Sequence, residues 1–247
     1  MSYKNIVRGR LTNILEVDNL NAGYGKSHIL FDVSLNVEDG TICAILGPNG
    51  SGKSTVLKTV FGLTTVYSGS IKFKGNNITG MEPYKIARLG IAYLPQVDSV
   101  YLNLNVRENL MMSGYILEKN EIEERIKYVE EIFPVLKEYR DRKVYTLSGG
   151  ERQILVMAMA LIRQPSLMMF DEPTAHLAPK IANQIFEKIK ELNKSHGITV
   201  VLVEQNVKRA LEESDTAYLL VSGKVNYYGP SKELMANEKF GKLFLGL

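Results

Sequence analysis

The sequence predicts an α/β fold with a mixed core sheet, an N-terminal antiparallel β part and a helical lobe. Three observations support this prediction. A glycine-rich loop at residues 47–54 follows an apolar run of strand length and precedes a helical stretch. Two acids, Asp171 and Glu172, end a second apolar run, as at the carboxyl edge of a buried parallel strand. Helical periodicity fills residues 106–140 between these sites.

In the N-terminal half, the pattern of apolar residues indicates mainly strands first and a helical region after them. Short apolar runs predict strands in the N-terminal part at 14–17, 30–36, 41–46 and 70–73, with a helix at 54–61 and a glycine turn at 75–80. A core strand at 91–94 leads into the helical lobe, expected at about residues 97–160. Within it, Ile122, Ile126 and Val129 recur at helical spacing among charged residues, which is typical of an amphipathic surface helix.

After the lobe, strands and helices alternate. The pattern predicts a strand at 167–171, a helix at 180–194, a strand at 198–203, a helix at 206–213 and a hairpin of 217–221 with 224–228 around Ser222 and Gly223. No internal repeat or second phosphate loop interrupts this order. We therefore expect residues 13–247 to form one domain, with residues 1–12 as a loose tail.

The glycine-rich loop has the pattern G-x-x-x-x-G-K-[ST] in a strand–loop–helix context. Its expected nucleotide-binding residues are Gly47, Pro48, Asn49, Gly50, Ser51, Gly52, Lys53, Ser54 and the adjoining Thr55. Glycines let successive backbone N–H groups face one anion, and the helix N-terminus adds a favourable dipole. Lys53 supplies a positive charge for the β- and γ-phosphates of ATP, and the Ser54 hydroxyl can ligate Mg²⁺.

The acid pair suits phosphoryl transfer, which needs a positioned water, a metal and charge stabilisation. We expect Asp171 to hold Mg²⁺ through water and Glu172 to orient and polarise the attacking water. Ligands of open α/β sheets bind at this carboxyl edge of the strands.

A third motif, Leu-Ser-Gly-Gly-Glu-Arg-Gln at residues 147–153, separates these two sites. Ser148 and Glu151 have the spacing of a capping box, so a helix is expected to begin here. A capped helix does not explain Gly149 and Gly150, because glycines weaken a first turn. The bare helix N-terminus is therefore interpreted as a second anion-binding site.

Together these motifs resemble those of the ABC ATPases. The resemblance implies a P-loop ABC ATPase cassette with ATP and Mg²⁺ as cofactors. It implies that Ser148, Gly149 and Gly150 of one subunit contact the γ-phosphate held by another, in a head-to-tail dimer with two ATP molecules. It also implies that Tyr24 stacks on the adenine and that Gln96 touches Mg²⁺ and hinges the helical lobe.

Two positions depart from the general family pattern. Ala178 stands where the family usually carries Asp, and Gln205 stands where it usually carries a switch His. His176 lies in the wrong loop to replace that His, so we expect it at the surface or a dimer edge. We predict that Gln205 bonds the γ-phosphate and helps to orient Glu172.

Four segments, at residues 132–136, 172–179, 203–206 and 242–247, resemble the ATP-binding subunits of branched-chain amino-acid uptake transporters. The resemblance covers about residues 12–247. Relatives that serve amides or urea look similar, so the solute stays open. The resemblance implies a second ATPase, identical or different, two membrane permeases, an extracytoplasmic binding protein and a place on the cytoplasmic face of the membrane. A permease helix is expected to dock on residues 97–112, where Val100, Tyr101, Leu102 and Leu104 interrupt a polar loop.

Three rival functions remain open. A chromosome or repair ATPase usually inserts long coiled coils between the phosphate loop and the third motif, and none fits here. A soluble ABC factor acting on ribosomes usually carries two cassettes in one chain, whereas this chain has one. A phosphoryl kinase outside this family would leave residues 147–153 unexplained.

Composition agrees with a globular subunit whose partners sit in the membrane. The 247 residues are 45% hydrophobic and 23% charged, enough for a sizeable core. The longest apolar run, 154–162, is too short for a membrane span. A net charge of +3 does not suggest nucleic-acid binding. The single cysteine, Cys43, lies in a predicted strand, so no disulfide is expected, in keeping with the cytosol.

Overall fold

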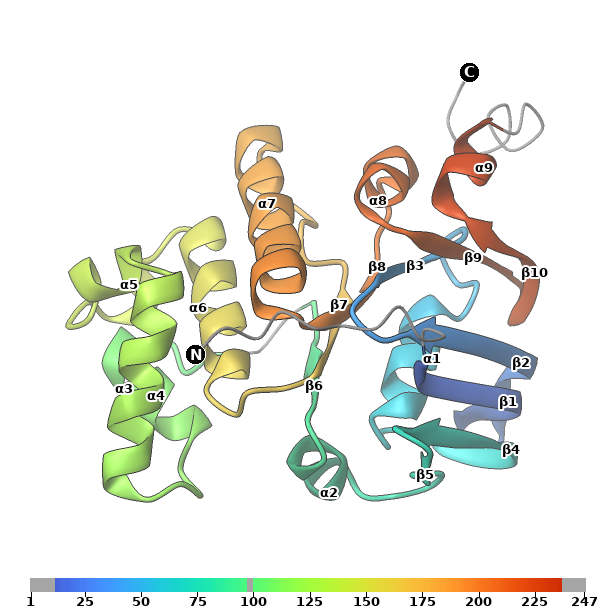
Figure 1. The fold of residues 1–247 in the computed structure, drawn as a ribbon, viewed down its shortest axis with the longest axis horizontal. Helices are drawn as coiled ribbons and strands as arrows, with labels where there is room; N and C mark the ends of the chain where they lie inside the picture. The colour runs from blue at the N-terminus through green and yellow to red at the C-terminus, as the bar shows by residue number, and fades with distance from the viewer. Residues whose placement is uncertain (1–11, 97–99, 237–247) are drawn as a thin grey trace.

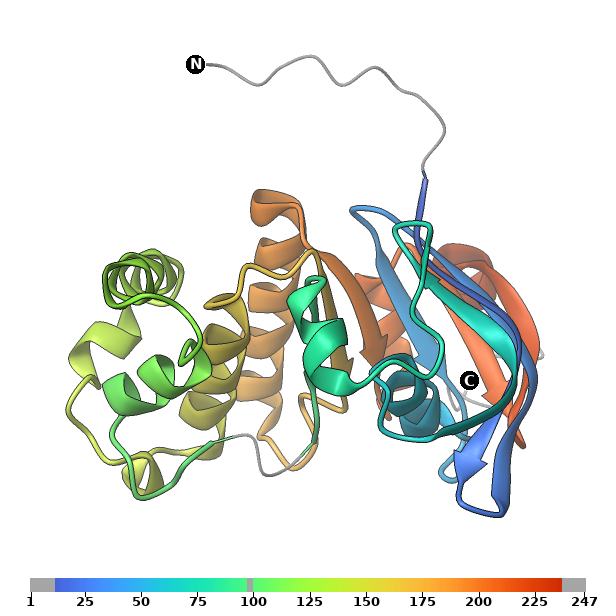
Figure 2. The ribbon, with the colours of Figure 1, turned by 90° about the horizontal axis from the view of Figure 1, so that it is seen from below.

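The computed structural model describes residues 12–96 and 100–236 and arranges them as two sheets beside a group of helices (Figure 1). Seen from below, the antiparallel sheet and the helical group lie at opposite ends, with the core sheet between them (Figure 2). The predicted fold class is confirmed. The predicted tail at 1–11, the docking residues 97–99 and the end of the chain from residue 237 lie outside the described residues.

The smaller sheet is antiparallel and has the order β2-β1-β4-β5. Its strands are β1 (Asn13–Tyr24), β2 (Ser27–Glu38), β4 (Thr65–Phe73) and β5 (Asn76–Asn77). β1 and β2 are each 12 residues long, far longer than their apolar cores suggested. The polar residues between the apolar ones fill the exposed positions of a half-buried strand, so the apolar runs alone marked only part of each strand.

The larger sheet has the order β10-β9-β3-β8-β7-β6. Its strands are β3 (Ile42–Leu46), β6 (Ile91–Leu94), β7 (Leu167–Asp171), β8 (Thr199–Val203), β9 (Thr216–Val221) and β10 (Lys224–Pro230). All are parallel to their neighbours except β10, which forms the predicted hairpin with β9.

The placement of residues 41–46 with the N-terminal strands was wrong. β3 lies in the core sheet, where it pairs with β8 on one side and β9 on the other. All five of its residues are buried. A continuous apolar run buried on both faces is typical of a central parallel strand, whereas the N-terminal strands alternate between buried and exposed residues.

The helices agree with the predicted order, with two additions. They are α1 (Lys53–Val60), α2 (Pro83–Arg88), α3 (Val106–Ser113), α4 (Lys119–Ile132), α5 (Val135–Glu138), the 3₁₀ turn η1 (Val144–Thr146), α6 (Gly149–Leu161), α7 (Pro179–His196), α8 (Val207–Glu213) and α9 (Ser231–Ala236). The sequence did not predict α2 and α9. Each has only six residues, too few to establish a helical period.

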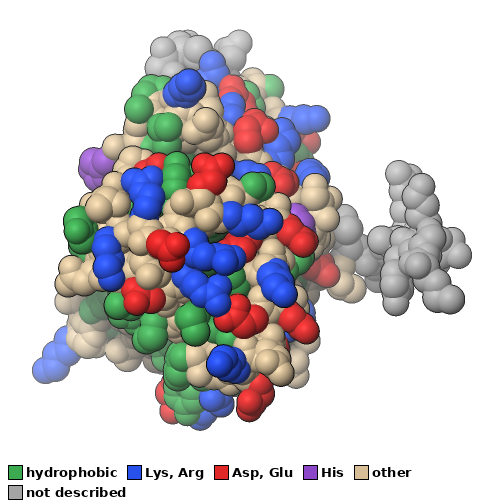
Figure 3. Space-filling model, turned by 90° about the vertical axis from the view of Figure 1, so that its left-hand side faces the viewer, with side chains coloured by type: hydrophobic (Ala, Val, Ile, Leu, Met, Phe, Trp, Pro, Cys, Tyr) green, Lys and Arg blue, Asp and Glu red, His purple; other side chains and the backbone are tan. Residues whose placement is uncertain are grey.

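Helices α3 to α6 gather on one side of the core sheet (Figure 1). In α4 the predicted apolar residues Ile122, Ile126 and Val129 are buried, which confirms the amphipathic helix. Positive and negative side chains are interspersed on the outward face of this group (Figure 3). One apolar cluster runs from these helices into the core sheet, so the group and the sheet share a core.

Among the residues that the structure describes, no helix combines the length and apolar character that a membrane crossing requires. Burial raises the pKa of the Cys43 thiol to about 12, so this cysteine stays protonated and is a packing residue.

Candidate functional site

The phosphate loop connects the end of β3 to the start of α1. Gly47 allows a close approach to the neighbouring strand, because a Cβ atom there would lie 2.1 Å from the backbone oxygen of Leu220. The Lys53 side chain is turned back onto the loop. Its Nζ donates to the backbone oxygens of Gly47 at 2.9 Å and Pro48 at 3.1 Å. The lysine therefore closes the loop around the space where an anion would bind.

The acid Asp171 at the end of β7 meets the phosphate loop. The Ser54 hydroxyl donates to Asp171 Oδ1 at 2.7 Å, across 117 residues of sequence. The Tyr93 hydroxyl donates to the other oxygen, Oδ2, at 3.0 Å. Burial, with the adjacent charge of Asp171, raises the pKa of Tyr93, so the hydroxyl remains a donor. Sequence reasoning missed Tyr93, whose only signal was its place near the end of a core strand.

This donor set fits Mg²⁺. The Ser54 hydroxyl and the Asp171 carboxylate are oxygen ligands, which Mg²⁺ prefers, and they face each other at the mouth of the loop. The third predicted ligand, Gln96, points its amide elsewhere: its Nε2 donates to Glu172 Oε2 at 3.2 Å.

Glu172 takes up a strained backbone conformation just past β7. Its φ of 52° is in the left-handed region, which costs a non-glycine residue about 1–3 kcal/mol and often accompanies function. Gln205 Nε2 donates to Glu172 Oε2 at 2.7 Å, and Gln96 bonds that same oxygen. The two amides hold the carboxylate by one oxygen and do not occupy the other. The predicted contact between Gln205 and Glu172 is present.

The charges at this site act on one another. Lys53 is only 5% exposed, and this burial lowers its pKa, while the nearby carboxylates of Glu172 and Asp171 partly offset the effect. The buried cation attracts a phosphate anion more strongly than an exposed one would, whereas the two carboxylates repel it, so a metal cation at the site would favour binding.

A cavity of about 420 Å³ brings most of the predicted residues together. Its lining comprises Ile29, Asn49, Gly50, Gly52, Lys53, Ser54, Thr55, Gln96, Glu172 and Gln205. Gly47, Pro48 and Ser51 support the loop without lining the cavity, and Ser51 is buried. Ile29, from β2, was not predicted, because nothing local marks it as different from other strand residues.

Tyr24 does not line this cavity. It is 44% exposed at the end of β1, where the chain turns into β2. The turn is held by Tyr67 of β4, whose hydroxyl lies 2.9 Å from the backbone oxygen of Gly25 and 3.2 Å from that of Ser27. An exposed ring on a braced turn is available for stacking, and its role remains a prediction.

The third motif begins α6 as predicted. Ser148 and Glu151 form both hydrogen bonds of a capping box. The structure gives Gly150 a packing role that the sequence could not reveal: a Cβ atom there would lie 2.3 Å from Ile181 Cγ2 on α7. The statement that capping leaves both glycines unexplained was therefore wrong for Gly150, since helix packing requires it. Gly149 is less confined, with Leu177 Cδ2 at 3.1 Å from the same position.

Gly149 faces a second cavity of about 400 Å³. Exposed His176 lines it too, together with Gln96 and Glu172, which also line the phosphate cavity. Neither Ser148, Gly149 nor Gly150 lines the phosphate cavity of its own chain. The third motif is thus separate from the phosphate loop within one subunit.

Glu204, directly after β8, is the acid that sequence reasoning passed over. It is 2% exposed, and burial raises the pKa of its carboxyl group, an effect opposed by hydrogen bonds from Thr174 and Gln205. A signal existed in the sequence: an acid that directly follows a fully apolar strand, as Asp171 does.

The family model described as "ABC transporter" matches residues 30–175. The chain is 51% identical over 234 residues to the probable branched-chain amino acid transport ATP-binding protein LivF of Archaeoglobus fulgidus, covering 95% of this chain and 99% of that protein. It is 40% identical to the high-affinity branched-chain amino acid transport ATP-binding protein BraG of Pseudomonas aeruginosa, covering 94% of this chain and 100% of that protein.

Solved structures show the same fold. The ADP conformation of MJ1267, an ATP-binding cassette of an ABC transporter, superimposes with a TM-score of 0.85 at 28% identity, covering 96% of this chain and 100% of that chain. A nucleotide-free ATP-binding cassette from an ABC transporter also gives a TM-score of 0.85, at 27% identity and the same coverage.

Proposed function

Because this chain belongs to the family of ABC transporter ATP-binding proteins, we propose that its ATP hydrolysis drives uptake of branched-chain or related amino acids. The chain is an ATPase by family, and its relatives LivF and BraG are named for branched-chain amino acid transport. The observation that carries the assignment is that the phosphate loop meets both acids: Ser54 bonds Asp171, and Glu172 lines the same cavity as the loop.

In the proposed reaction the triphosphate enters the phosphate cavity, and Lys53 exchanges its two backbone partners for phosphate oxygens. Ser54 and Asp171 would hold Mg²⁺, which when bound supplies neutralising charge to the phosphates. Glu172 orients the water that attacks the γ-phosphate. Its carboxylate oxygen that the amides leave unoccupied accepts the proton of this water. Gln96 and Gln205 fix that carboxylate from its other side.

The subunit is proposed to work as a dimer, identical or with a second ABC ATPase. Gly149 lines the second cavity and not the phosphate cavity of its own chain, which leaves its helix N-terminus available for the γ-phosphate of another subunit. Tyr24 is proposed to stack on the adenine. We assign residues 13–247 to one ABC ATPase domain, with residues 97–160 as its helical lobe.

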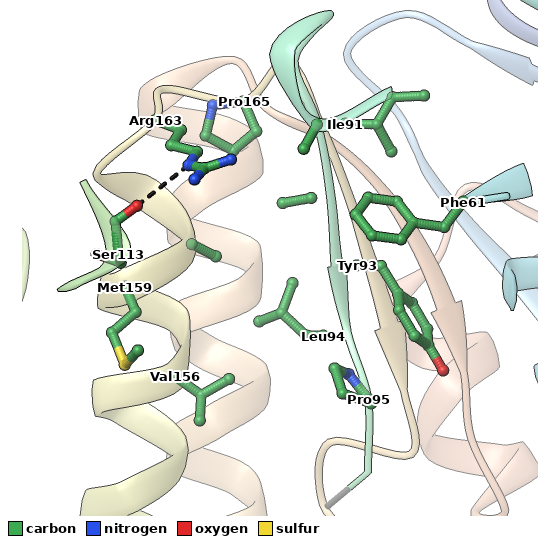
Figure 4. A pocket seen from close by; sticks show the side chains of 13 residues that line it. Phe61, Ile91, Tyr93, Leu94, Pro95, Ser113, Val156, Met159, Arg163 and Pro165 are labelled. Atoms are coloured by element: carbon green, nitrogen blue, oxygen red, sulfur yellow. Dashed lines mark hydrogen bonds between the residues drawn. The ribbon is translucent and has the colours of Figure 1, made fainter. Parts of the chain in front are cut away.

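We propose that the subunit works at the cytoplasmic face of the membrane. Its proposed partners there are permease subunits and an extracytoplasmic binding protein. Two cavities, of about 240 and 480 Å³, share Ser113, Met159 and Arg163 and so form one groove. Figure 4 shows the first of them, between β6 and α6. The lining of the first cavity includes Phe61, Tyr93, Val156 and Met159, and that of the second includes Tyr101, Met112 and Tyr115. Arg163 Nε donates to the Ser113 oxygen where they join. We propose that a permease helix docks in this groove.

The groove refines the expected docking residues. Tyr101 is 54% exposed and lines the groove, whereas Leu102 is 45% exposed but does not line it. Tyr101→Glu should therefore abolish transport and complex assembly, because a charge would be buried against an apolar partner. Leu102→Glu is the matched control and should affect both less. Co-purification with the permease and solute uptake measure this, and equal effects of the two variants would contradict the groove assignment.

Gln205 has a separate testable role. Gln205→Ala should lower kcat about 10²–10³-fold, the effect of removing one donor aimed at transition-state charge. Gln205→His should introduce a new inflection in the pH–rate profile near the pKa of His, about 6.5, because imidazole titrates there and the Gln amide does not. Steady-state ATPase rates from pH 5.5 to 8 in the assembled complex test this. Full activity of Gln205→Ala would leave this residue with a structural role only.

Uptake of labelled leucine, isoleucine and valine by cells that carry the chain or lack it tests the proposed function. Uptake should need the intact chain and fail with Glu172→Gln. Normal uptake of these solutes without the chain, with ATPase activity intact in vitro, would point instead to amides, urea or a role outside transport.

A further inference from the structure

Glu204 sits where three elements of the site converge. It follows β8, the strand that pairs with β7, and the N–H of Glu172 donates to the last residue of β8, Val203, at 2.9 Å. Glu204 and Glu172 thus stand at the ends of neighbouring parallel strands. Glu172 lines the phosphate cavity, whereas Glu204 is buried and does not line it.

Every hydrogen bond that Glu204 makes within the described residues is one that it accepts. Its Oε1 accepts from the Thr174 N–H at 3.1 Å and from the Thr174 hydroxyl at 2.7 Å. Its Oε2 accepts from the N–H of Gln205 at 3.2 Å. No cation is paired with it in the described part of the chain. A carboxylate, with two acceptor oxygens, satisfies this set of donors better than an amide could.

Both partners of Glu204 flank Glu172. Thr174 lies two residues after it, in the loop that carries His176 and Leu177 toward the second cavity. Gln205 bonds the Glu172 carboxylate through its side chain while its backbone is held by Glu204. The hydrogen bonds therefore form a closed ring. They link Glu172 to Gln205, Gln205 to Glu204 and Glu204 to Thr174, and the backbone leads from Thr174 back to Glu172.

We propose that Glu204 is a positioning residue for ATP hydrolysis: it fixes the Thr174 loop and the Gln205 backbone together, so that the Gln205 amide and the strained Glu172 carboxylate stay aligned. This inference rests on the proposed role of Glu172 in activating water. Burying an acid with no cation is unfavourable, and an apolar residue would fill the space at less cost. The gain is a second connection between the two loops, beside the hydrogen bond from Gln205 to Glu172.

The isosteric variant Glu204→Gln tests the proposal. The amide nitrogen of Gln cannot accept a hydrogen bond, yet it must face the N–H of either Thr174 or Gln205. One of the two loops therefore loses its hydrogen bond, while the volume of the side chain at position 204 stays the same. We expect kcat to fall about a hundredfold, the scale of a misplacement of about 1 Å in a catalytic group. KM for ATP should stay within about twofold of wild type, because the phosphate loop is unaffected. Steady-state ATPase assays of the full-length chain give both constants.

Two variants separate positioning from stability. Glu130→Gln removes another buried acid, one that Arg140 bonds in the helical group, and should lower the melting temperature while leaving kcat unchanged. Thr174→Val removes only the hydroxyl donor and should lower kcat less than Glu204→Gln does. If Glu204→Gln does not fold, Thr174→Val keeps the proposal testable, since an unchanged kcat there would overturn it.

The outcomes divide clearly. A fall in kcat for Glu204→Gln at constant KM, absent in Glu130→Gln, supports the proposal. Wild-type kcat in folded Glu204→Gln, or a loss that merely follows the melting temperature, overturns it. Glu172→Gln is measured alongside to separate the two proposals. If Glu172→Gln is active, the proposed role of Glu172 is rejected. If Glu172→Gln is inactive and Glu204→Gln is fully active, only the positioning role of Glu204 is rejected.

Discussion

Glu172→Gln should retain ATP binding and lose about two to four orders of magnitude in kcat, the usual contribution of a general base. The amide cannot draw a proton from water, but it keeps the volume of the carboxylate and can still meet Gln96 and Gln205. ATP should then trap the subunits as a stable dimer, because the step that releases them is blocked. Single-turnover hydrolysis and size-exclusion chromatography with ATP and Mg²⁺ measure the two effects.

Lys53→Ala is the contrasting variant. It removes the cation that the structure places at the loop, between two backbone oxygens and two acids, so ATP binding itself should fail. Near wild-type turnover of Glu172→Gln in the assembled complex would show that another group activates the water.

Gly149→Asp should abolish ATP-induced dimerisation while the monomer still binds ATP. The glycine begins α6 and does not line the phosphate cavity of its own chain, and we propose that it contacts the ATP held by a second subunit. An Asp carboxylate there would oppose the γ-phosphate, and like charges at close range repel strongly in a desolvated interface. Sedimentation of the variant with ATP and Mg²⁺ gives the dimer fraction.

Two controls accompany this variant. Ser195→Asp adds the same charge at an exposed position of α7 and should dimerise normally. Gly149→Ala adds a Cβ 3.1 Å from Leu177 Cδ2, which a small shift can accommodate, and should weaken dimerisation only modestly. Unimpaired dimers of Gly149→Asp would reduce the third motif to a helix cap.

Much of the site was predictable because its residues are sequence neighbours. The phosphate loop, the acid pair and the capping box each lie within eight consecutive residues or fewer, and each has a distinctive local pattern. β6 and β7 were predicted with their observed bounds, since their apolar runs end abruptly. The family resemblance then related these separate motifs to one another.

Other features required the folded chain. Tyr93 bonds Asp171 across 78 residues, and Glu204 bonds Thr174 across 30, yet nothing near either residue in the sequence marks its partner. Gly150 has its reason in Ile181 on another helix. The grouping of 41–46 with the N-terminal strands failed likewise, because strand pairing depends on the whole sheet and not on one segment.

Residue types at short spacing were enough to indicate the nucleotide chemistry, the family and most of the element order. The folded chain was needed to show which side chains hold Glu172, which residues line the phosphate cavity, and that Gly149 is not one of them. The physical reason is that hydrogen bonds and packing act over a few ångströms, and only folding brings residues far apart in the chain within that distance.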